Sequence, residues 1–516
     1  MRIIGEKKKR QVSLTASGAI GQGHAIYVNS DGTASSVNNK AITGHYAMSS
    51  EHSVCYNIGS DTNILNSSNN SFAKSYGSSV YDPTNKKIVI AYGDNSNSSY
   101  GTAVVATVSG TTISYGTPVV YQSTDSATHP DGVVYDSNSN RIVITYTNNS
   151  TNNIQAIVGQ VSGNSISFGT AVTINGGQGE AASSFDSKLN RVVTVFRDAS
   201  SHIKGATGAV DPSDNSITYG AIQTVYGNTG TNLSICYNPQ DDRHVVVWRN
   251  TAASNVGTSW SFNLLAGDPA SFFNNSTFIQ FEAGACGGHR LTYDEANNRI
   301  VVVYYDAGNS DYLTATAGRI QDGNIIWTED GGNVVIYSGV SESIATAYDP
   351  QAKAIIIAYR DGGDSNRGKI AFAHKDFASQ NFAYDYLGTV KYNTGSVSYN
   401  HMAFDIDQGT AVLTYTAPTS YATSVCFQLD STPLTNENFI GFATSSVSNG
   451  DTIVIDTRGG VSDVHSDLAV GQRYYVQRNG TISIDATTYD NISHADHTDP
   501  IEAGMSINTT SLIVKG

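Results

Sequence analysis

Residues 78–94 read SSVYDPTNKKIVIAYGD, and six further stretches of the chain repeat this pattern. In each copy a short apolar run ends in an aromatic residue, and an Asp or Asn then begins a turn. A β-branched run follows and carries a second aromatic residue ten positions after that Asp or Asn. Successive turn residues are 50–56 positions apart. The other copies are GVVYDSNSNRIVITYTN (132–148), SSFDSKLNRVVTVFRD (183–198), SICYNPQDDRHVVVWRN (234–250), LTYDEANNRIVVVYYD (291–306), TAYDPQAKAIIIAYRD (346–361) and MAFDIDQGTAVLTYTA (402–417).

Each copy has the chemistry of a β-hairpin. An Asp side chain can accept hydrogen bonds from its own downstream backbone, so it favours the turn between the two strands. In the first copy a third strand is predicted at 101–106 and a fourth at 118–121. Every repeat is therefore expected to contain four antiparallel strands. Its second aromatic residue, Tyr92 in the first copy, is expected to be buried between neighbouring repeats.

A period of 50–56 residues with four strands is typical of a β-propeller blade. A lone four-stranded sheet cannot bury both of its faces, and radial stacking of repeats solves this. The pattern predicts an all-β fold that contains a seven-bladed β-propeller. A tandem of seven small sandwiches is the alternative, and each repeat is short for a sandwich of its own.

The seventh repeat lacks a fourth strand. Its strands are expected at 402–406, 410–416 and 423–430, after which the sequence changes character near residue 435. The segment 52–58, with 63–65 beyond it, can take the missing place and close the ring. Cys55 and Cys426 would then lie on neighbouring strands, although cross-strand geometry often does not suit a disulfide, and none is predicted.

The two ends of the chain resemble each other. Residues 19–35 and 468–483 both read G-Q, an aromatic-bearing strand, Asn-Gly-Thr or Asp-Gly-Thr, and a second strand. Such a turn is a strong hairpin signal. We expect residues 1–40 and 435–516 to form one small β module, into which the propeller of residues 41–434 is inserted.

Composition excludes several classes of protein. The chain has 516 residues, of which 49 are Gly, 30 are Tyr and only 14 are Leu. Good strand and turn formers prevail, which excludes a helical bundle, a coiled coil and a TIM barrel. The formal net charge is −15, and residues 1–10 hold five of the 29 basic residues. The strongly acidic remainder of the chain argues against nucleic-acid binding. Neither a secretory signal nor an apolar membrane span is recognisable in the sequence.

No cofactor or metal is predicted. The four cysteines are scattered, without zinc-ligand spacing. The stretch from Ser493 to Asp499 contains His494 and His497, which could ligate a metal across a trimer axis. A solvated loop is the alternative for this stretch.

The repeats and the tail resemble tail-fibre and other appendage proteins of bacteriophages, notably marine phages. The resemblance is carried by YDPTNKKIVIAYGD with GTAVVATVSGTTISYGTPVVY and by NFIGFATSSV, GQRYYVQRNGT and EAGMSINTTSLIVKG in the tail. It implies a virion component with a receptor-binding propeller, which assembles with other virion proteins and commonly forms trimers. It carries over no catalytic motif.

The residues after each second aromatic residue are the candidate binding site. They follow the second strand of each repeat, at a propeller face that ligands usually meet, and His129, Glu180 and His289 are expected in neighbouring loops between blades. An Arg guanidinium donates several hydrogen bonds in a fixed planar geometry, and an Asp carboxylate accepts hydrogen bonds from hydroxyls, so the two together suit a sugar. Salt bridges and turn bonds that merely cap the blades are the alternative. The candidate residues are Arg197, Asp198, Arg249, Tyr305, Asp306, Arg360 and Asp361.

Three functions compete. The first is a non-enzymatic virion appendage that recognises a host surface glycan. The second is a purely structural virion part, such as a nozzle, collar or head decoration. The third is a propeller glycan hydrolase; sialidase boxes of the form S-x-D-x-G-x-x-W are absent from the sequence, and no motif nominates a catalytic carboxylate pair.

Overall fold

The computed structural model describes residues 10–29, 32–36, 47–49, 52–53, 56–64, 77–177, 179–267, 271–273, 277–327, 332–373, 390–418, 421–429, 439–476, 481–484 and 501–515. The chain divides into two compact units, Met1–Gly59 with Leu429–Gly516, and Ser60–Gln428. Within the described residues the fold is all-β, and its helices are three short 3-10 turns: η1 (Asn95–Asn97), η2 (Thr251–Ala253) and η3 (Ala307–Asn309). None of the described helices is long and apolar enough to cross a membrane.

The hairpin predicted for each repeat is present in the structure. Its first strand pairs antiparallel with its second, as in Asp82 opposite Lys87. The first strands are β8 (Ser78–Asp82), β12 (Val119–Asp136), β17 (Ala181–Asp186), β21 (Gln223–Asn238), β25 (Ile279–Asp294), β29 (Val334–Asp349) and β33 (Ser398–Asp405). The second strands are β9 (Lys87–Asp94), β13 (Arg141–Asn148), β18 (Arg191–Arg197), β22 (Arg243–Asn250), β26 (Arg299–Asp306), β30 (Ala354–Asp361) and β34 (Thr410–Thr416).

Two outer strands complete each repeat. The third strands are β10 (Tyr100–Ser109), β14 (Asn153–Ser162), β19 (His202–Asp211), β23 (Val256–Leu265), β27 (Tyr312–Gln321), β31 (Arg367–Ala373) and β35 (Ala422–Leu429). The fourth strand is the first half of β12, β21, β25 or β29, or the separate strands β16 (Val172–Gly176) and β32 (Val390–Ser396). One continuous strand therefore often leaves one repeat and enters the next.

Two details differ from the sequence prediction. In five repeats a tight turn follows the third strand, and an additional short strand pairs antiparallel with the end of the third strand before the fourth strand begins. His129 and His289 lie within β12 and β25 rather than in loops between blades, because each of these strands runs without a break from one repeat into the next. The additional strands are β11 (Thr112–Tyr115), β15 (Ser165–Phe168), β20 (Ser216–Tyr219), β24 (Ser271–Phe273) and β28 (Asn324–Ile326).

The Asp-led turn works as the sequence predicted. The Asp136 carboxylate accepts hydrogen bonds from the backbone N–H groups of Asn138 and Ser139, at 2.9 and 3.0 Å. All seven turn residues accept at least one such bond. Four residues later the backbone is left-handed in every repeat, which favours Asn, Asp and Gly. These residues are Lys86, Asn140, Asn190, Asp242, Asn298, Lys353 and Gly409.

The core lies between repeats. The prediction that the second aromatic residues are buried is confirmed, because all seven are completely shielded from solvent: Tyr92, Tyr146, Phe196, Trp248, Tyr304, Tyr359 and Tyr415. Apolar clusters join neighbouring repeats; Trp248, for example, shares a cluster with Val193 and Val195 of the preceding repeat. Tyr92 of the first repeat packs with Val412 and Cys426 of the seventh.

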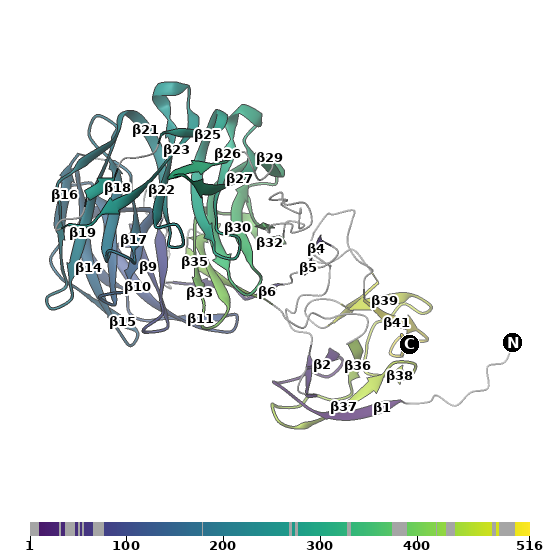
Figure 1. Cartoon of the computed structure of the whole chain (residues 1–516). Helices are drawn as coiled ribbons and strands as arrows, with labels where there is room; N and C mark the ends of the chain where they lie inside the picture. The colour runs from purple at the N-terminus through teal and green to yellow at the C-terminus, as the bar shows by residue number, and fades with distance from the viewer. Residues whose placement is uncertain are drawn as a thin grey trace, which may run out of the picture. The chain divides into compact units, whose positions relative to one another are not determined.

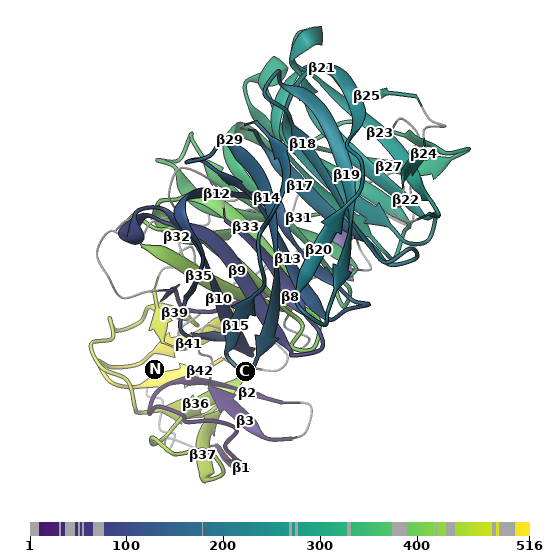
Figure 2. The same ribbon diagram turned by 90° about the vertical axis from the view of Figure 1, so that its left-hand side faces the viewer.

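The first strands contact one another in a closed cycle, β8, β12, β17, β21, β25, β29, β33 and β8 again. Figures 1 and 2 show the sheets side by side, with green β33 and β35 next to blue β9 and β10. β7 (Thr62–Asn63) pairs with β35, so a segment from before the first repeat supplies a strand to the seventh. The hydroxyl of Tyr415 donates to Asp61 at 2.7 Å beside this strand. Cys55 lies outside the described residues, and Cys426 is a free, buried thiol.

The other unit combines strands from both ends of the chain. One sheet has the order β1 (Gln11–Thr15), β37 (Thr452–Thr457), β36 (Phe439–Ala443), β2 (Ala25–Val28) and β3 (Ala34–Ser36). The other has the order β38 (Val461–Ser462), β42 (Leu512–Val514), β41 (Glu502–Ser506), β39 (Arg473–Val476) and β40 (Ile482–Ser483). β4 (Ala47–Ser49) pairs with β5 (His52–Ser53), and β6 (Tyr56–Ile58) follows. His494 and His497 lie outside the described residues.

Candidate functional site

The predicted arginines occupy one register position. Arg197, Arg249 and Arg360 each follow the buried aromatic residue of a second strand, at the end of β18, β22 and β30. All three side chains are half-buried, and each Nε atom is buried without a hydrogen-bond partner among the described residues. Any hydrogen bond that these groups make to a ligand must therefore come from their outer guanidinium nitrogens.

The surroundings of the three arginines differ. The Arg360 guanidinium forms an ion pair with Glu342 on the neighbouring strand. Arg197 and Arg249 form no ion pair with any residue in the described part of the chain. Their positive charges instead act electrostatically on buried histidines. Burial lowers the pKa of His289 to about 4, and the charge of Arg249 acts in the same direction.

The predicted aspartates are directed into their own loops. Asp198 accepts hydrogen bonds from the backbone of Ser200 and His202, both at 2.9 Å. Asp361 accepts from the backbone of Gly363 at 2.9 Å and forms a buried ion pair with Lys369. These contacts are the blade-capping interactions that stood as the alternative to sugar binding.

Tyr305 and Asp306 end β26, and both are half-buried. Unlike Asp198 and Asp361, Asp306 makes no side-chain capping hydrogen bond to the turn that follows it, η3. Burial raises the pKa of Asp306, and the nearby Glu282 charge raises it further. The seven predicted residues therefore share one end of the second strands, but Asp198 and Asp361 have their hydrogen bonds satisfied locally.

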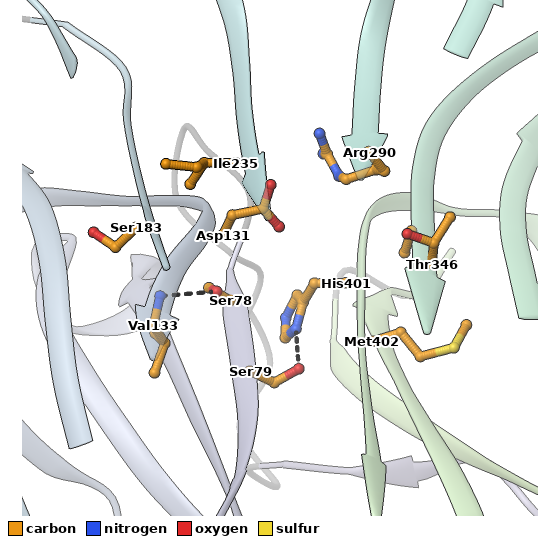
Figure 3. Close-up of a pocket in the computed structure, with 11 residues that line it drawn as sticks. Ser78, Ser79, Asp131, Val133, Ser183, Ile235, Arg290, Thr346, His401 and Met402 are labelled. Carbon is orange, nitrogen blue, oxygen red and sulfur yellow. Dashed lines mark hydrogen bonds between the residues drawn. The ribbon is translucent and has the colours of Figure 1, made fainter. Parts of the chain in front are cut away.

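A cavity that the sequence analysis did not predict lies among the first strands. Its volume is about 130 Å³, and every one of the seven repeats contributes to its lining. Figure 3 shows Asp131 and Arg290 near one end, with His401 below them. Ser79 lies beside His401, and Thr346 lies on the opposite wall. Because the first strands form a closed cycle, this cavity occupies the middle of the ring.

Bulges in the first strands position the residues of this cavity. In β12 the pairing shifts between Thr128 and Val133, and in β25 it shifts between Gly287 and Arg290. A bulge bends the strand and re-aims its side chains. The bulge of β12 contains more residues than the others and carries Asp131 to the cavity wall. The left-handed residues of the five bulges are Asp131, Asn232, Gly288, Ser343 and Tyr399.

Hydrogen bonds hold the polar groups of the cavity. The Ser234 hydroxyl donates to Asp131 Oδ2 at 2.5 Å, and Arg290 Nη1 donates to the His289 carbonyl at 2.6 Å. Burial raises the pKa of the Asp131 carboxyl, although the Arg290 charge and the Ser234 hydroxyl oppose that rise. Burial, with the charge of Arg290 added, lowers the pKa of His401 to about 3. His401 Nδ1 lies 3.2 Å from Ser79 Oγ and is neutral at physiological pH.

The sequence did contain a signal for this cavity. Four positions before each turn residue most repeats have a small residue: Ser78, Gly132, Ala182, Ser234 and Ala345. Two repeats have Arg290 and His401 at that position instead. Side chains of this size break the repeat pattern at a site where the fold requires small ones, and such a break indicates a local role.

Comparison with protein-family models and with curated protein sequences found no match. Among solved structures, the chain is similar to the BP39L lectin of Burkholderia pseudomallei, with 8% identity and a TM-score of 0.50 over 70% of this chain and 99% of that one. It is also similar to the periplasmic gluconolactonase PpgL of Pseudomonas aeruginosa, with 10% identity and a TM-score of 0.47 over 69% of this chain and 97% of that one. The likeness to the lectin shows an all-β fold of the propeller type.

Proposed function

We propose that this chain is a non-enzymatic, carbohydrate-recognising protein of a virus particle, built on a seven-bladed propeller. The blade number is supported by the closed cycle of first strands and by the strand that β7 adds to the seventh repeat. The pairing of β1 with β37 and of β2 with β36 supports a small module that both ends of the chain form around the inserted propeller.

The observation that carries the binding proposal is the state of Arg197 and Arg249. They occupy corresponding positions in adjacent repeats, and neither has an ion-pair partner among the described residues. An unpaired, half-buried guanidinium is costly unless it gains a partner, and hydroxyl or carboxylate oxygens of a glycan would supply one. The similar structure from Burkholderia pseudomallei is a lectin, which accords with this use of the fold.

The setting on a virion rests on the likeness of the repeats and of the tail to phage appendage proteins. In that setting the partners are other virion proteins and a host surface glycan, and the chain assembles as a homo-oligomer, most simply a trimer. The acidic body, with 43 acidic and 24 basic residues beyond residue 10, disfavours nucleic acid as a partner, and no insertion into a membrane is proposed.

A glycan array tests the binding proposal, with the purified wild type compared with the double variant Arg197→Ala, Arg249→Ala. The matched control is Arg191→Ala, Arg243→Ala, which removes the same charge from the opposite ends of the same two strands. We expect the control to keep the wild-type pattern and the first variant to lose it. An unchanged pattern in the first variant would refute the role of these two arginines.

A purely structural role in the particle is the second candidate. It is favoured by the ion pair of Arg360 with Glu342 and by that of Asp361 with Lys369, which hold the strand ends without a ligand. Locating the protein in intact particles separates the two candidates. Strand ends covered by other subunits would support the structural role, and accessible strand ends would support recognition.

Catalysis is the least favoured of the three candidates. Glycoside hydrolysis ordinarily requires two carboxyl groups that flank the scissile bond. At the strand ends, where glycan binding is proposed, the carboxylates of Asp198 and Asp361 are engaged by their own loops, and Asp361 also pairs with Lys369. We therefore expect no sugar to be released from any glycan that the protein binds, and measurable hydrolysis would overturn the non-enzymatic assignment.

A further inference from the structure

The central cavity has the size of a small-molecule site. One water molecule requires about 10–15 Å³ on this scale, so the cavity offers room for roughly ten non-hydrogen atoms. Its volume is about 130 Å³. Asp131, Thr346 and Met402 on its wall remain partly accessible to solvent. The cavity is therefore not a sealed packing defect.

The charges on the wall balance. Asp131 is the one carboxylic acid and Arg290 the one arginine or lysine of the described lining, and His401 is neutral at physiological pH. A cation would be repelled by Arg290, and an anion would be repelled by Asp131. A neutral ligand avoids both penalties.

The hydrogen-bonding groups suit hydroxyls. Asp131 Oδ2 accepts from Ser234, whereas no described residue donates to Asp131 Oδ1. The Ser78 hydroxyl accepts from the backbone of Val133 at 3.2 Å, and its own proton has no acceptor among the described residues. The Thr346 hydroxyl accepts from Thr292 at 2.6 Å, and its proton likewise has no acceptor among the described residues. The wall thus offers a strong acceptor and two donors within one small space, the set that vicinal hydroxyls can satisfy together.

We propose that the central cavity binds a neutral, polyhydroxylated small molecule of monosaccharide size, with Asp131 accepting hydrogen bonds from its hydroxyls. This site is separate from the arginines at the strand ends. Its ligand is held by the first strands of several repeats, and neither Arg197 nor Arg249 lines the cavity. The proposal can therefore fail while the glycan-recognition proposal stands, and the reverse also holds.

Isothermal titration calorimetry on the full chain tests the proposal. The probes are the neutral monosaccharides D-glucose, D-mannose, D-galactose, L-fucose and D-xylose, with D-glucuronate and D-galacturonate as charged counterparts. We expect at least one neutral sugar to bind, and the uronate of matching configuration to bind at least tenfold more weakly. No binding of any neutral sugar, or tighter binding of a uronate, would overturn the proposal.

Two variants locate the ligand. Asp131→Asn keeps an oxygen for the Ser234 hydroxyl but removes the charge, and we expect it to weaken binding at least tenfold. Met402→Trp fills the cavity without removing a polar group, and we expect it to abolish binding. Arg191→Ala with Arg243→Ala, at the opposite ends of β18 and β22 and outside the cavity lining, is the control and should bind the monosaccharide as the wild type does. Thermal unfolding confirms that each variant is folded, and wild-type affinity in both cavity variants would place the ligand elsewhere.

Discussion

Glu342 and Arg360 face each other on neighbouring strands of the sixth repeat, and their side chains form an ion pair. Arg197 occupies the same position in the third repeat, and its backbone N–H donates to the carbonyl of Glu180 at 2.9 Å. The Glu180 carboxylate, however, accepts from the backbone of Leu233 at 3.1 Å. One position of the repeat thus holds a paired arginine in one blade and an unpaired arginine in another.

This difference predicts unequal effects of substitution on glycan binding. Arg197→Ala combined with Arg249→Ala should weaken host adsorption at least tenfold, which is about 1.4 kcal/mol. Arg360→Ala should change adsorption little, because Arg360 already has a partner in Glu342. Adsorption rates of particles that carry each variant measure this. A larger loss with Arg360→Ala than with the double variant would reverse the assignment.

The buried aromatic residues should dominate stability. Trp248 is fully buried and packs against Tyr226, with ring centroids 5.3 Å apart. Trp248→Ala should lower the free energy of unfolding by about 3–5 kcal/mol, the usual effect of removing a large aromatic side chain from a core. Ile222→Ala is a control at an exposed site, and it should stay near the wild-type value. Urea denaturation of the three proteins, monitored by far-UV circular dichroism, measures these differences in the free energy of unfolding.

Closure of the ring depends on the segment around β7. Asp61 accepts hydrogen bonds from Tyr415 at 2.7 Å and from Asn393 at 2.9 Å. Asp61→Ala should therefore lower the free energy of unfolding by about 1–3 kcal/mol, because the buried Tyr415 hydroxyl loses its acceptor. Deletion of residues 61–64 should do more, since it removes β7 and its pairing with Thr423 and Ser424 of β35 and so exposes part of a strand edge to aggregation. A deletion variant that stays monodisperse and unfolds cooperatively would show that closure lies elsewhere.

Stability should depend on the protonation of His401. The pKa of native His401 is about 3, because burial and the Arg290 charge disfavour the imidazolium. An unfolded histidine titrates near 6.5, as is usual for a solvated imidazole. The unfolded state binds more protons between these values, so the free energy of unfolding falls as the pH decreases through this window. Asp131, whose pKa is raised, contributes in the opposite direction.

Urea denaturation of the wild type and of His401→Asn at a series of pH values isolates this effect, because Asp131 is present in both proteins. The wild type should lose stability more steeply than the variant between pH 6.5 and about 3. Parallel curves would indicate that His401 is protonated in the native state or is accessible to water.

The sequence predicted the repeat well because each copy contains its own turn chemistry. An Asp such as Asp136 forms its turn through adjacent backbone groups, and a residue such as Tyr146 is buried in every copy. The central cavity could not be predicted in the same way. Asp131, Ser234 and His401 come from three different repeats, and their contacts depend on bulges that no local pattern marks.

The predicted strand-end residues show a related limit. Their common position follows from the period, but their partners do not. Whether Arg360 meets Glu342, or Glu180 turns toward Leu233 instead, depends on the neighbouring strand and on the next repeat. Only Arg290 and His401, which replace small residues in the repeat, offered a visible signal of the cavity.

The pairing of β1 with β37 has a consequence for how the chain is made. Gln11 Nε2 donates to Asp456 Oδ1 across 445 residues of sequence, and Asn63 accepts from Thr423 across 360. A ribosome that adds about 5–20 residues per second needs roughly 20–90 s to span the longer interval. Through that time β1 and β7 emerge without their partners, while the repeats between them can already pack on one another. Both long-range pairings then become possible within the last part of translation, so the nascent polypeptide depends on chaperones or on local repeat packing to keep its early strands from aggregating.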